Sequence, residues 1–140
     1  MMTRHRQKRC TRWTVLFLGT VALTGCESGG RTGVKGTVTY AGQPLAVGTI
    51  TFVPAGEKGI KCGGRIENGQ YQIEPLFGPM PGPHRVEIRW TKPTGKKYKN
   101  EFGEIFDVTR EGLPDKHHKQ STLTATIHAG MNVLDFNLEK

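Results

Sequence analysis

The sequence of 140 residues is poor in the residue types that most often carry chemistry. It holds three cysteines and, after residue 26, two serines, Ser28 and Ser121, neither of which stands in a Gly-x-Ser-x-Gly elbow. No Cys/His spacing typical of a structural zinc site is present. The glycine-rich residues 56–64 lack the Gly-Lys-Ser/Thr ending of a phosphate-binding loop. These absences argue against an enzyme, a structural zinc domain and a nucleotide-binding domain, and we expect no cofactor.

The N-terminus has the layout of a secretory signal peptide. Apolar residues dominate positions 13–25, a run shorter than the roughly 20 residues that a membrane-spanning helix needs. The residues before it contain no acid and five Lys and Arg side chains. Because signal peptides combine a basic start, a short apolar centre and a small final residue, we predict one over residues 1–25. Its basic side chains are Arg4, Arg6, Lys8, Arg9 and Arg12.

The end of this run, Leu23-Thr24-Gly25-Cys26, resembles the lipobox of bacterial lipoproteins. The resemblance implies cleavage before Cys26, a lipid of the palmitate type on its sulfur, and an extracytoplasmic location on the cell membrane or the outer membrane. Two or more acyl chains hold a protein stably on a bilayer. The glycine-rich residues 26–33 are then predicted to form a flexible tether. An ordinary signal peptide with a chance cysteine is the alternative.

Removal of residues 1–25 would change the charge and the cysteine content of the chain. The full sequence has a formal net charge of +8, but five of its twenty Lys and Arg residues precede residue 26 and all twelve acids follow it. The mature chain would therefore carry +3, too little for a dedicated nucleic-acid binder. Cys10 would leave with the signal peptide and Cys26 would carry lipid, so Cys62 would have no disulfide partner. We interpret Cys62 as a small buried apolar residue rather than a reactive thiol.

The rest of the chain alternates apolar and polar residues with a period of two, which is typical of half-buried β-strands. Asn68-Gly69 is the strongest hairpin signal because both residues tolerate positive φ. No stretch after residue 33 shows the 3.6-residue period of an amphipathic helix. Seven short strands separated by turns favour an all-β, antiparallel β-sandwich over residues 34–140. The expected strands are residues 34–40, 49–53, 65–67, 70–73, 86–90, 122–127 and 134–138.

The inward-facing positions of these strands give the predicted core. Apolar side chains on one face of each strand are expected to pack together, while the polar side chains on the other face stay in water. The predicted core side chains are Val34, Val38, Tyr40, Ile50, Phe52, Ile66, Tyr71, Ile73, Val86, Ile88, Trp90, Leu123, Ile127, Leu134, Phe136 and Leu138.

Residues 91–120 interrupt this rhythm. Prolines and glycines punctuate the segment, and loops longer than about 15 residues are often functional. We therefore predict a long loop, with room for one short strand or helical turn near residues 104–108. Because loops on a rigid scaffold commonly carry binding contacts, this loop is the preferred binding surface. Its candidate contact residues are Lys92, Lys96, Lys97, Lys99, His117 and His118.

Several short motifs follow one another in a recognisable order. They are residues 34–40, Gly42-Gln43-Pro44-Leu45, residues 48–54, Asn68-Gly69-Gln70-Tyr71, residues 81–88, and residues 113–116 with 121–123. The order resembles carboxypeptidase regulatory-like domains, whose first strand carries a glycine and leads through a Gly-x-Pro-Leu turn into the second. The last motif resembles the tail of small lipoproteins of planctomycete-type bacteria. The resemblance covers nearly all of residues 34–140 and implies a transthyretin-like (prealbumin-like) sandwich.

The resemblance brings no catalytic residues with it. In carboxypeptidases this domain is an accessory to a separate catalytic domain. One transthyretin-like branch hydrolyses 5-hydroxyisourate and ends in Tyr-Arg-Gly-Ser, a signature that residues 136–140 lack.

The first functional hypothesis is a non-enzymatic accessory or binding module of the cell envelope. It would be anchored through the lipid on Cys26 and would contact an unknown envelope protein or glycan. The alternative is a small envelope enzyme or metal-binding protein that uses His84, His117, His118 or His128. Adjacent residues of an extended chain point apart, so the pair His117-His118 suits one metal ion poorly, and we predict no metal site. A purely structural role in the envelope is a third hypothesis.

Overall fold

The computed structural model describes residues 30–56 and 59–140. The predicted signal peptide, Cys26 and residues 26–29 of the predicted tether lie outside the described residues. Within the described ranges no helix has the length and apolar character needed to cross a membrane. The elements are β1 Val34–Tyr40, β2 Gln43–Pro44, β3 Val47–Pro54, β4 Cys62–Glu67, β5 Gln70–Ile73, η1 Pro75–Phe77, β6 Gly82–Lys99, β7 Ile105–Glu111, η2 Asp115–His117, β8 Thr124–Ile127, β9 Asn132–Val133 and β10 Phe136–Leu138, where η marks a 3-10 helix.

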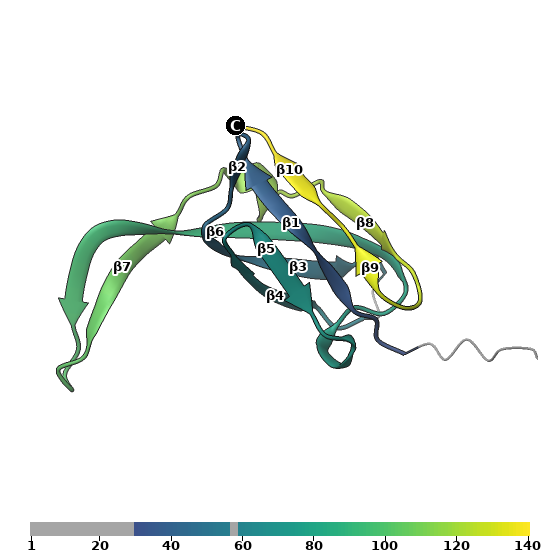
Figure 1. Ribbon diagram of the computed structural model, residues 1–140, viewed down its shortest axis with the longest axis horizontal. Coiled ribbons are helices and arrows are strands. Elements are labelled where there is room, and N and C mark those ends of the chain that lie inside the picture. The colour runs from purple at the N-terminus through teal and green to yellow at the C-terminus, as the bar shows by residue number, and fades with distance from the viewer. Residues whose placement is uncertain (1–29, 57–58) are drawn as a thin grey trace, which may run out of the picture.

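The strands form one curved sheet in the order β10-β1-β5-β4-β3-β6-β7. β2 and β9 also pair with β1, and β8 also pairs with β6. Neighbouring strands are antiparallel except that β1 runs parallel to β9 and β10. β1 and β10 cross in front of β3 and β6, so the architecture is sandwich-like (Figure 1). The all-β prediction is confirmed, and each of the seven predicted strands is present: β1 and β5 have the predicted ends, and the other five have shifted ends.

The core lies on the inner face of this curved sheet. In β3 the buried positions alternate with more exposed ones, as the period of two predicts, and the side chains of Ile50 and Phe52 are fully buried. Leu45 and Leu113, which lie outside the predicted strands, also belong to the core. Four predicted core residues are only partly buried and pack against the core, namely Tyr40, Trp90, Leu123 and Leu134. The remaining predicted core residues are buried.

Glycines are required at two places in this part of the fold. Asn68 and Gly69 have φ values of 50° and 76°, and they form the tight turn between β4 and β5 that the sequence predicts. A Cβ atom on Gly36 would lie 1.8 Å from the carbonyl oxygen of Leu134. The missing side chain therefore lets β1 approach the segment that leads into β10. Next to this approach, the backbone N–H and the hydroxyl of Thr37 both donate to Asp135 Oδ1 at 2.7 Å.

Residues 91–120 are not a long loop, and the structure corrects that prediction. β6 continues through them as far as Lys99 and pairs with β7 in an antiparallel hairpin. Pro93 begins an irregularity in the strand register that ends at Lys97, a location where a missing ladder N–H is tolerated. Gly103, with a φ of 85°, lies in the connecting turn. Pro93 and Gly103 thus mark a bulge and a turn within a hairpin.

We call residues 91–111 the arm and the rest of the described chain the body. The arm extends away from the body, at the opposite end of the long axis from the first described residues (Figure 1). Residues 112–123, between β7 and β8, lack strand structure and include the short helix η2.

Candidate interaction surfaces

The arm carries exposed apolar side chains on both of its strands and in its turn. Phe102 in the turn is 88% exposed, and Ile105 at the start of β7 is 67% exposed. Tyr98 and Phe106 are directly paired across the two strands, and their rings stack with centroids 5.6 Å apart. Aromatic cross-strand pairs stabilise a hairpin by up to about 1 kcal/mol. The pair therefore stiffens the outer half of the arm while leaving apolar surface in contact with water.

The turn of the arm is held by one asparagine. Asn100 Oδ1 accepts hydrogen bonds from the backbone N–H of Phe102 at 3.0 Å and of Glu104 at 2.9 Å. Its side-chain amide donates to Glu104 Oε2 at 2.7 Å. Because Asn100 satisfies the backbone of the turn, Phe102 is presented outward by a fixed loop.

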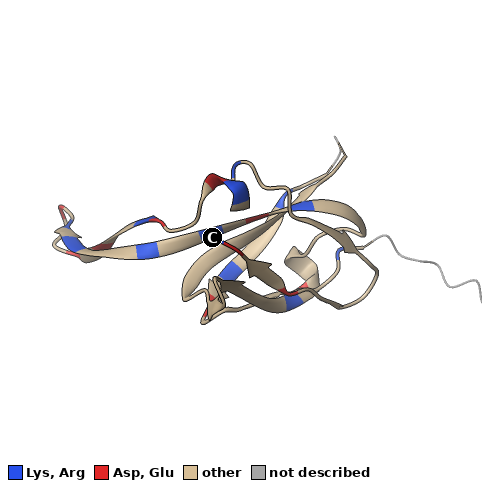
Figure 2. Cartoon of the chain, turned by 90° about the horizontal axis from the view of Figure 1, so that it is seen from above, with Lys and Arg blue, Asp and Glu red and all other residues tan. Residues whose placement is uncertain are grey.

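The lysines predicted as contact residues lie on the arm, on the β6 strand. Lys97 Nζ lies 4.0 Å from Asp107 Oδ1, and Lys92 Nζ lies 5.0 Å from the ring centroid of Trp90. Lys96 and Lys99 are exposed. Figure 2 shows acidic residues between the basic ones along the arm, so the arm is a surface of mixed charge and not a basic patch.

The base of the arm is joined to the body through Glu111. Its Oε1 accepts hydrogen bonds from the backbone N–H of Trp90 at 2.9 Å, of Gly112 at 3.0 Å and of Leu113 at 3.1 Å. Its Oε2 lies 3.6 Å from the guanidinium of Arg89. A single carboxylate therefore holds both strands at the point where they leave the body.

His117 and His118 do not lie on an exposed loop. Both are buried at η2, with exposed fractions of 6% and 1%. His117 Nε2 is 2.8 Å from the carbonyl oxygen of Glu139 and its ring packs edge-on against Tyr40. His118 Nε2 is 3.2 Å from the carbonyl oxygen of Leu113 and 3.4 Å from Asp115 Oδ1. These contacts indicate that the two histidines pack inside the body, next to the base of the arm.

The four histidines of the alternative hypothesis are not brought together in a cluster of ligands. His84 is buried in β6, with Nδ1 3.0 Å from the carbonyl oxygen of Gly82 and its ring edge-on to Phe52, whereas His128 is exposed. Within residues 30–56 and 59–140, no three His, Cys, Asp or Glu side chains gather as metal ligands do. Cys62 is partly buried, and this burial raises the pKa of its thiol. A raised pKa disfavours the reactive thiolate at neutral pH.

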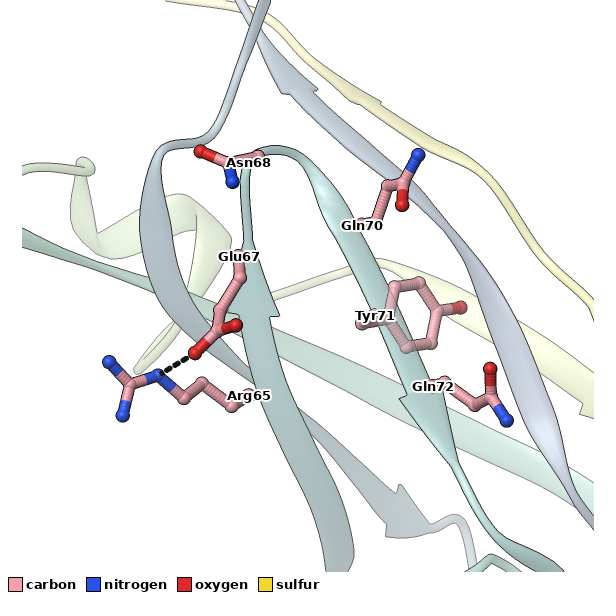
Figure 3. Close-up of a pocket in the computed structure, with 6 residues that line it drawn as sticks. All are labelled: Arg65, Glu67, Asn68, Gln70, Tyr71 and Gln72. Atoms are coloured by element: carbon pink, nitrogen blue, oxygen red, sulfur yellow. Dashed lines mark ion pairs between the residues drawn. The ribbon is translucent and has the colours of Figure 1, made fainter.

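A polar depression lies on β4 and β5, away from the arm (Figure 3). Arg65 and Glu67 form an exposed ion pair of 2.8 Å beside Gln70 and Gln72. The Tyr71 hydroxyl donates to the carbonyl oxygen of Leu134 at 2.8 Å, and burial raises the pKa of this phenol. The depression is open to water and offers neither an activated nucleophile nor a buried charge.

Another group of exposed apolar side chains surrounds the point where the described chain begins. We call this group the apolar end, and we define it as Ile60, Leu76, Phe77, Met80 and Met131, which are 50–74% exposed. Ile60 and Met80 line a small cavity together with Arg31, and an adjoining cavity of about 300 Å³ extends to His84. Contiguous exposed apolar surface commonly marks a contact with a protein or a membrane.

The sequence alone does not predict the apolar end. Its members are scattered over three connections between strands, and no periodic pattern connects them. The exposed aromatic residues of the arm were missed for a related reason, because their segment was predicted to be irregular.

Fold and surfaces together define a small all-β, sandwich-like protein with a projecting hairpin. Comparisons of the chain with protein-family models, with curated proteins and with solved structures give no match.

Proposed function

We propose that this protein is a lipid-anchored, extracytoplasmic binding module of the cell envelope, and that it contacts an envelope protein or glycan through the arm. The observation that carries the proposal is the projecting hairpin with exposed Phe102 and Ile105 and a stacked Tyr98–Phe106 pair. Monomeric soluble proteins seldom expose several large apolar side chains together on one projection unless a partner covers them. Aromatic residues with few rotatable bonds are also the side chains that most often dominate binding energy.

The anchor in this proposal is a lipid on Cys26. Its support is the motif Leu23-Thr24-Gly25-Cys26 behind a basic start and a short apolar run.

The transthyretin-like, carboxypeptidase regulatory-like assignment belongs to the proposal as well. Its support is the order of the motifs, which fall on β1, the turn before β3, β3 itself, the β4–β5 turn and β6.

Site-specific photo-crosslinking in native envelopes tests the arm. A photoreactive phenylalanine analogue at Phe102 is expected to give discrete adducts, and the same analogue at Val133 on the body, which is 63% exposed, is expected to give none of them. Protease and glycan-hydrolase digestion then distinguishes a protein partner from a glycan. Identical adducts at both positions, or none at Phe102, would contradict binding through the arm.

Metabolic labelling with a fatty-acid analogue tests the anchor separately. The wild-type protein is expected to take up the label and the Cys26→Ala variant to remain unlabelled. Equal labelling of the two proteins, or an unlabelled wild type, would rule out a lipid on Cys26.

A further inference from the structure

The apolar end has no role in binding through the arm, because the two surfaces lie at opposite ends of the molecule (Figure 1). Leu76 and Phe77 belong to η1, a three-residue helix of which no residue is buried. They are 74% and 64% exposed, and Ile60 is 73% exposed. A loop that presents two adjacent large apolar side chains to water needs an explanation that the fold itself does not supply.

η1 is fastened to the first residues of the described chain. The backbone N–H and the hydroxyl of Thr32 both donate to the carbonyl oxygen of Pro79, at 2.8 Å and 3.1 Å. A Cβ atom on Gly78 would lie 1.8 Å from the carbonyl oxygen of Thr32, so only glycine permits this approach. The exposed side chains of η1 therefore have a fixed position relative to the start of the domain.

Covalent geometry limits how far the start of the domain can be from Cys26. Residue 30 follows Cys26 by four residues, and an extended chain covers at most about 3.6 Å per residue, so the two lie within about 14 Å of each other. If Cys26 carries a lipid in the bilayer, residue 30 is within this distance of the membrane surface. The apolar end, which lies beside the start of the domain, is then within reach of the headgroups.

The charges near the apolar end suit a membrane surface. Arg31 and Lys61 are exposed cations: Lys61 follows Ile60 in the chain, and Arg31 lines the same cavity as Ile60 and Met80. Glu74 is the exposed acid next to η1, and it accepts a hydrogen bond from Gln72 at 2.6 Å. Two cations beside apolar side chains match an interface where anionic headgroups overlie hydrocarbon.

We propose that the apolar end is a membrane-contact surface, which inserts Leu76 and Phe77 between lipid headgroups and directs the arm away from the bilayer. This inference rests on the proposed lipid anchor. The apolar end would contact the same bilayer that holds the lipid of Cys26. The lipid supplies attachment, and the apolar end supplies orientation, because a flexible tether alone would leave the body free to turn.

Fluorescence quenching in vesicles tests this orientation. The mature lipidated protein, which begins at Cys26, is reconstituted into phosphatidylglycerol and phosphatidylcholine vesicles that contain brominated lipids, which quench only tryptophan at membrane depth. Phe77→Trp and Phe102→Trp form a matched pair, because both replace an exposed phenylalanine and the two positions lie at opposite ends. The signal of the parent protein, which contains Trp90, is subtracted.

Quenching of the tryptophan at position 77 is expected to exceed that at position 102 at least threefold. Leu76→Trp is a second reporter that should behave like Phe77→Trp, so a failure of one variant to fold does not decide the result. Equal quenching at both ends, stronger quenching at position 102, or no quenching at either end would overturn the proposal.

Mass spectrometry of the reconstituted protein separates this result from that of the proposed function. An acylated Cys26 with no quenching at positions 76 and 77 overturns the membrane-contact surface and leaves the anchor intact. An unmodified Cys26 overturns the anchor, and with it the inference that depends on the length of the tether.

Discussion

The body and the arm are built from the same kind of strand but are stabilised differently. In the body, the side chains of β3 and β6 pack on one face against a common core, and Ile50, Phe52, Val86 and Ile88 are fully buried. In the arm, β6 and β7 have only each other, and most side chains on both faces are exposed. Burial therefore stabilises the body, whereas local pairing, the Asn100 turn and the Glu111 base maintain the arm. The surface of the arm can change at little cost to the fold.

Truncation of one phenylalanine in each region gives the largest expected contrast. Phe52→Ala leaves a cavity in the core, and we expect the free energy of unfolding to fall by about 3–5 kcal/mol. Phe102→Ala removes an exposed side chain, and we expect a change of less than about 0.5 kcal/mol. Urea denaturation measures both. Similar losses for the two variants would show that the arm shares the stability of the body.

Glu111 is where the two regions meet, and its removal is expected to have an intermediate effect. Glu111→Ala leaves the backbone N–H groups of Trp90 and Leu113 without their acceptor, whereas that of Gly112 keeps the carbonyl oxygen of Trp90, and we expect a cost of about 1–3 kcal/mol. Amide hydrogen exchange should also become faster along residues 91–99 and 105–111. Glu101→Ala, at an exposed acid of the arm turn, is the control and should change neither quantity. An unaltered exchange pattern in Glu111→Ala would mean that the arm is held without this carboxylate.

A smaller and more local effect is expected at the tip. Asn100→Ala removes the acceptor for the backbone N–H groups of Phe102 and Glu104. Because the lost hydrogen bonds should lower the local opening free energy by about 1 kcal/mol, hydrogen exchange of these two amides should become roughly fivefold faster. The midpoint of urea denaturation should stay at its wild-type value. A lowered midpoint would show that the turn of the arm contributes to the stability of the body.

The smallest expected effect is a pH dependence within the body. The hydrogen bonds from the hydroxyl and the backbone N–H of Thr37 lower the pKa of Asp135 below its usual value of 3.8. A carboxyl whose pKa is lower in the folded state stabilises the fold above its unfolded pKa, and this stabilisation is lost as the pH falls through the folded value. The wild type should therefore be more stable than Asp135→Asn at pH 6, and the difference should shrink below about pH 3.8. A difference that stays constant down to pH 2 would contradict the lowered pKa.

The strands of the body could be predicted from the sequence because each has one buried and one exposed face. The resulting alternation is visible in residues 47–54, and the Asn68-Gly69 turn has a conformation that few other dipeptides adopt. The arm gave no such signal. Both of its faces meet water, so the alternation of apolar and polar residues disappears, and the pairing of Tyr98 with Phe106 depends on a register that only the folded hairpin defines.

The candidate surfaces were predictable only in part. The four lysines of the predicted binding segment do lie on the arm, although on a strand. His117 and His118 were placed in the same exposed segment, but η2 and the contacts with Glu139 and Leu113 bury them. The apolar end depends on Thr32 and Pro79 lying side by side, a contact between residues far apart in the chain that no local pattern encodes.

β6 has a mechanical consequence. It is one strand of eighteen residues, about 60 Å at the usual rise, and it runs from the cavity beside Met80 to the tip of the arm. β3 pairs with it antiparallel over seven consecutive positions, from Gly48–Trp90 to Pro54–His84. A pull on the tip acts along β6, so it loads the hydrogen bonds of this ladder together in shear and does not open them one by one. We therefore expect the molecule to resist tension between its two ends.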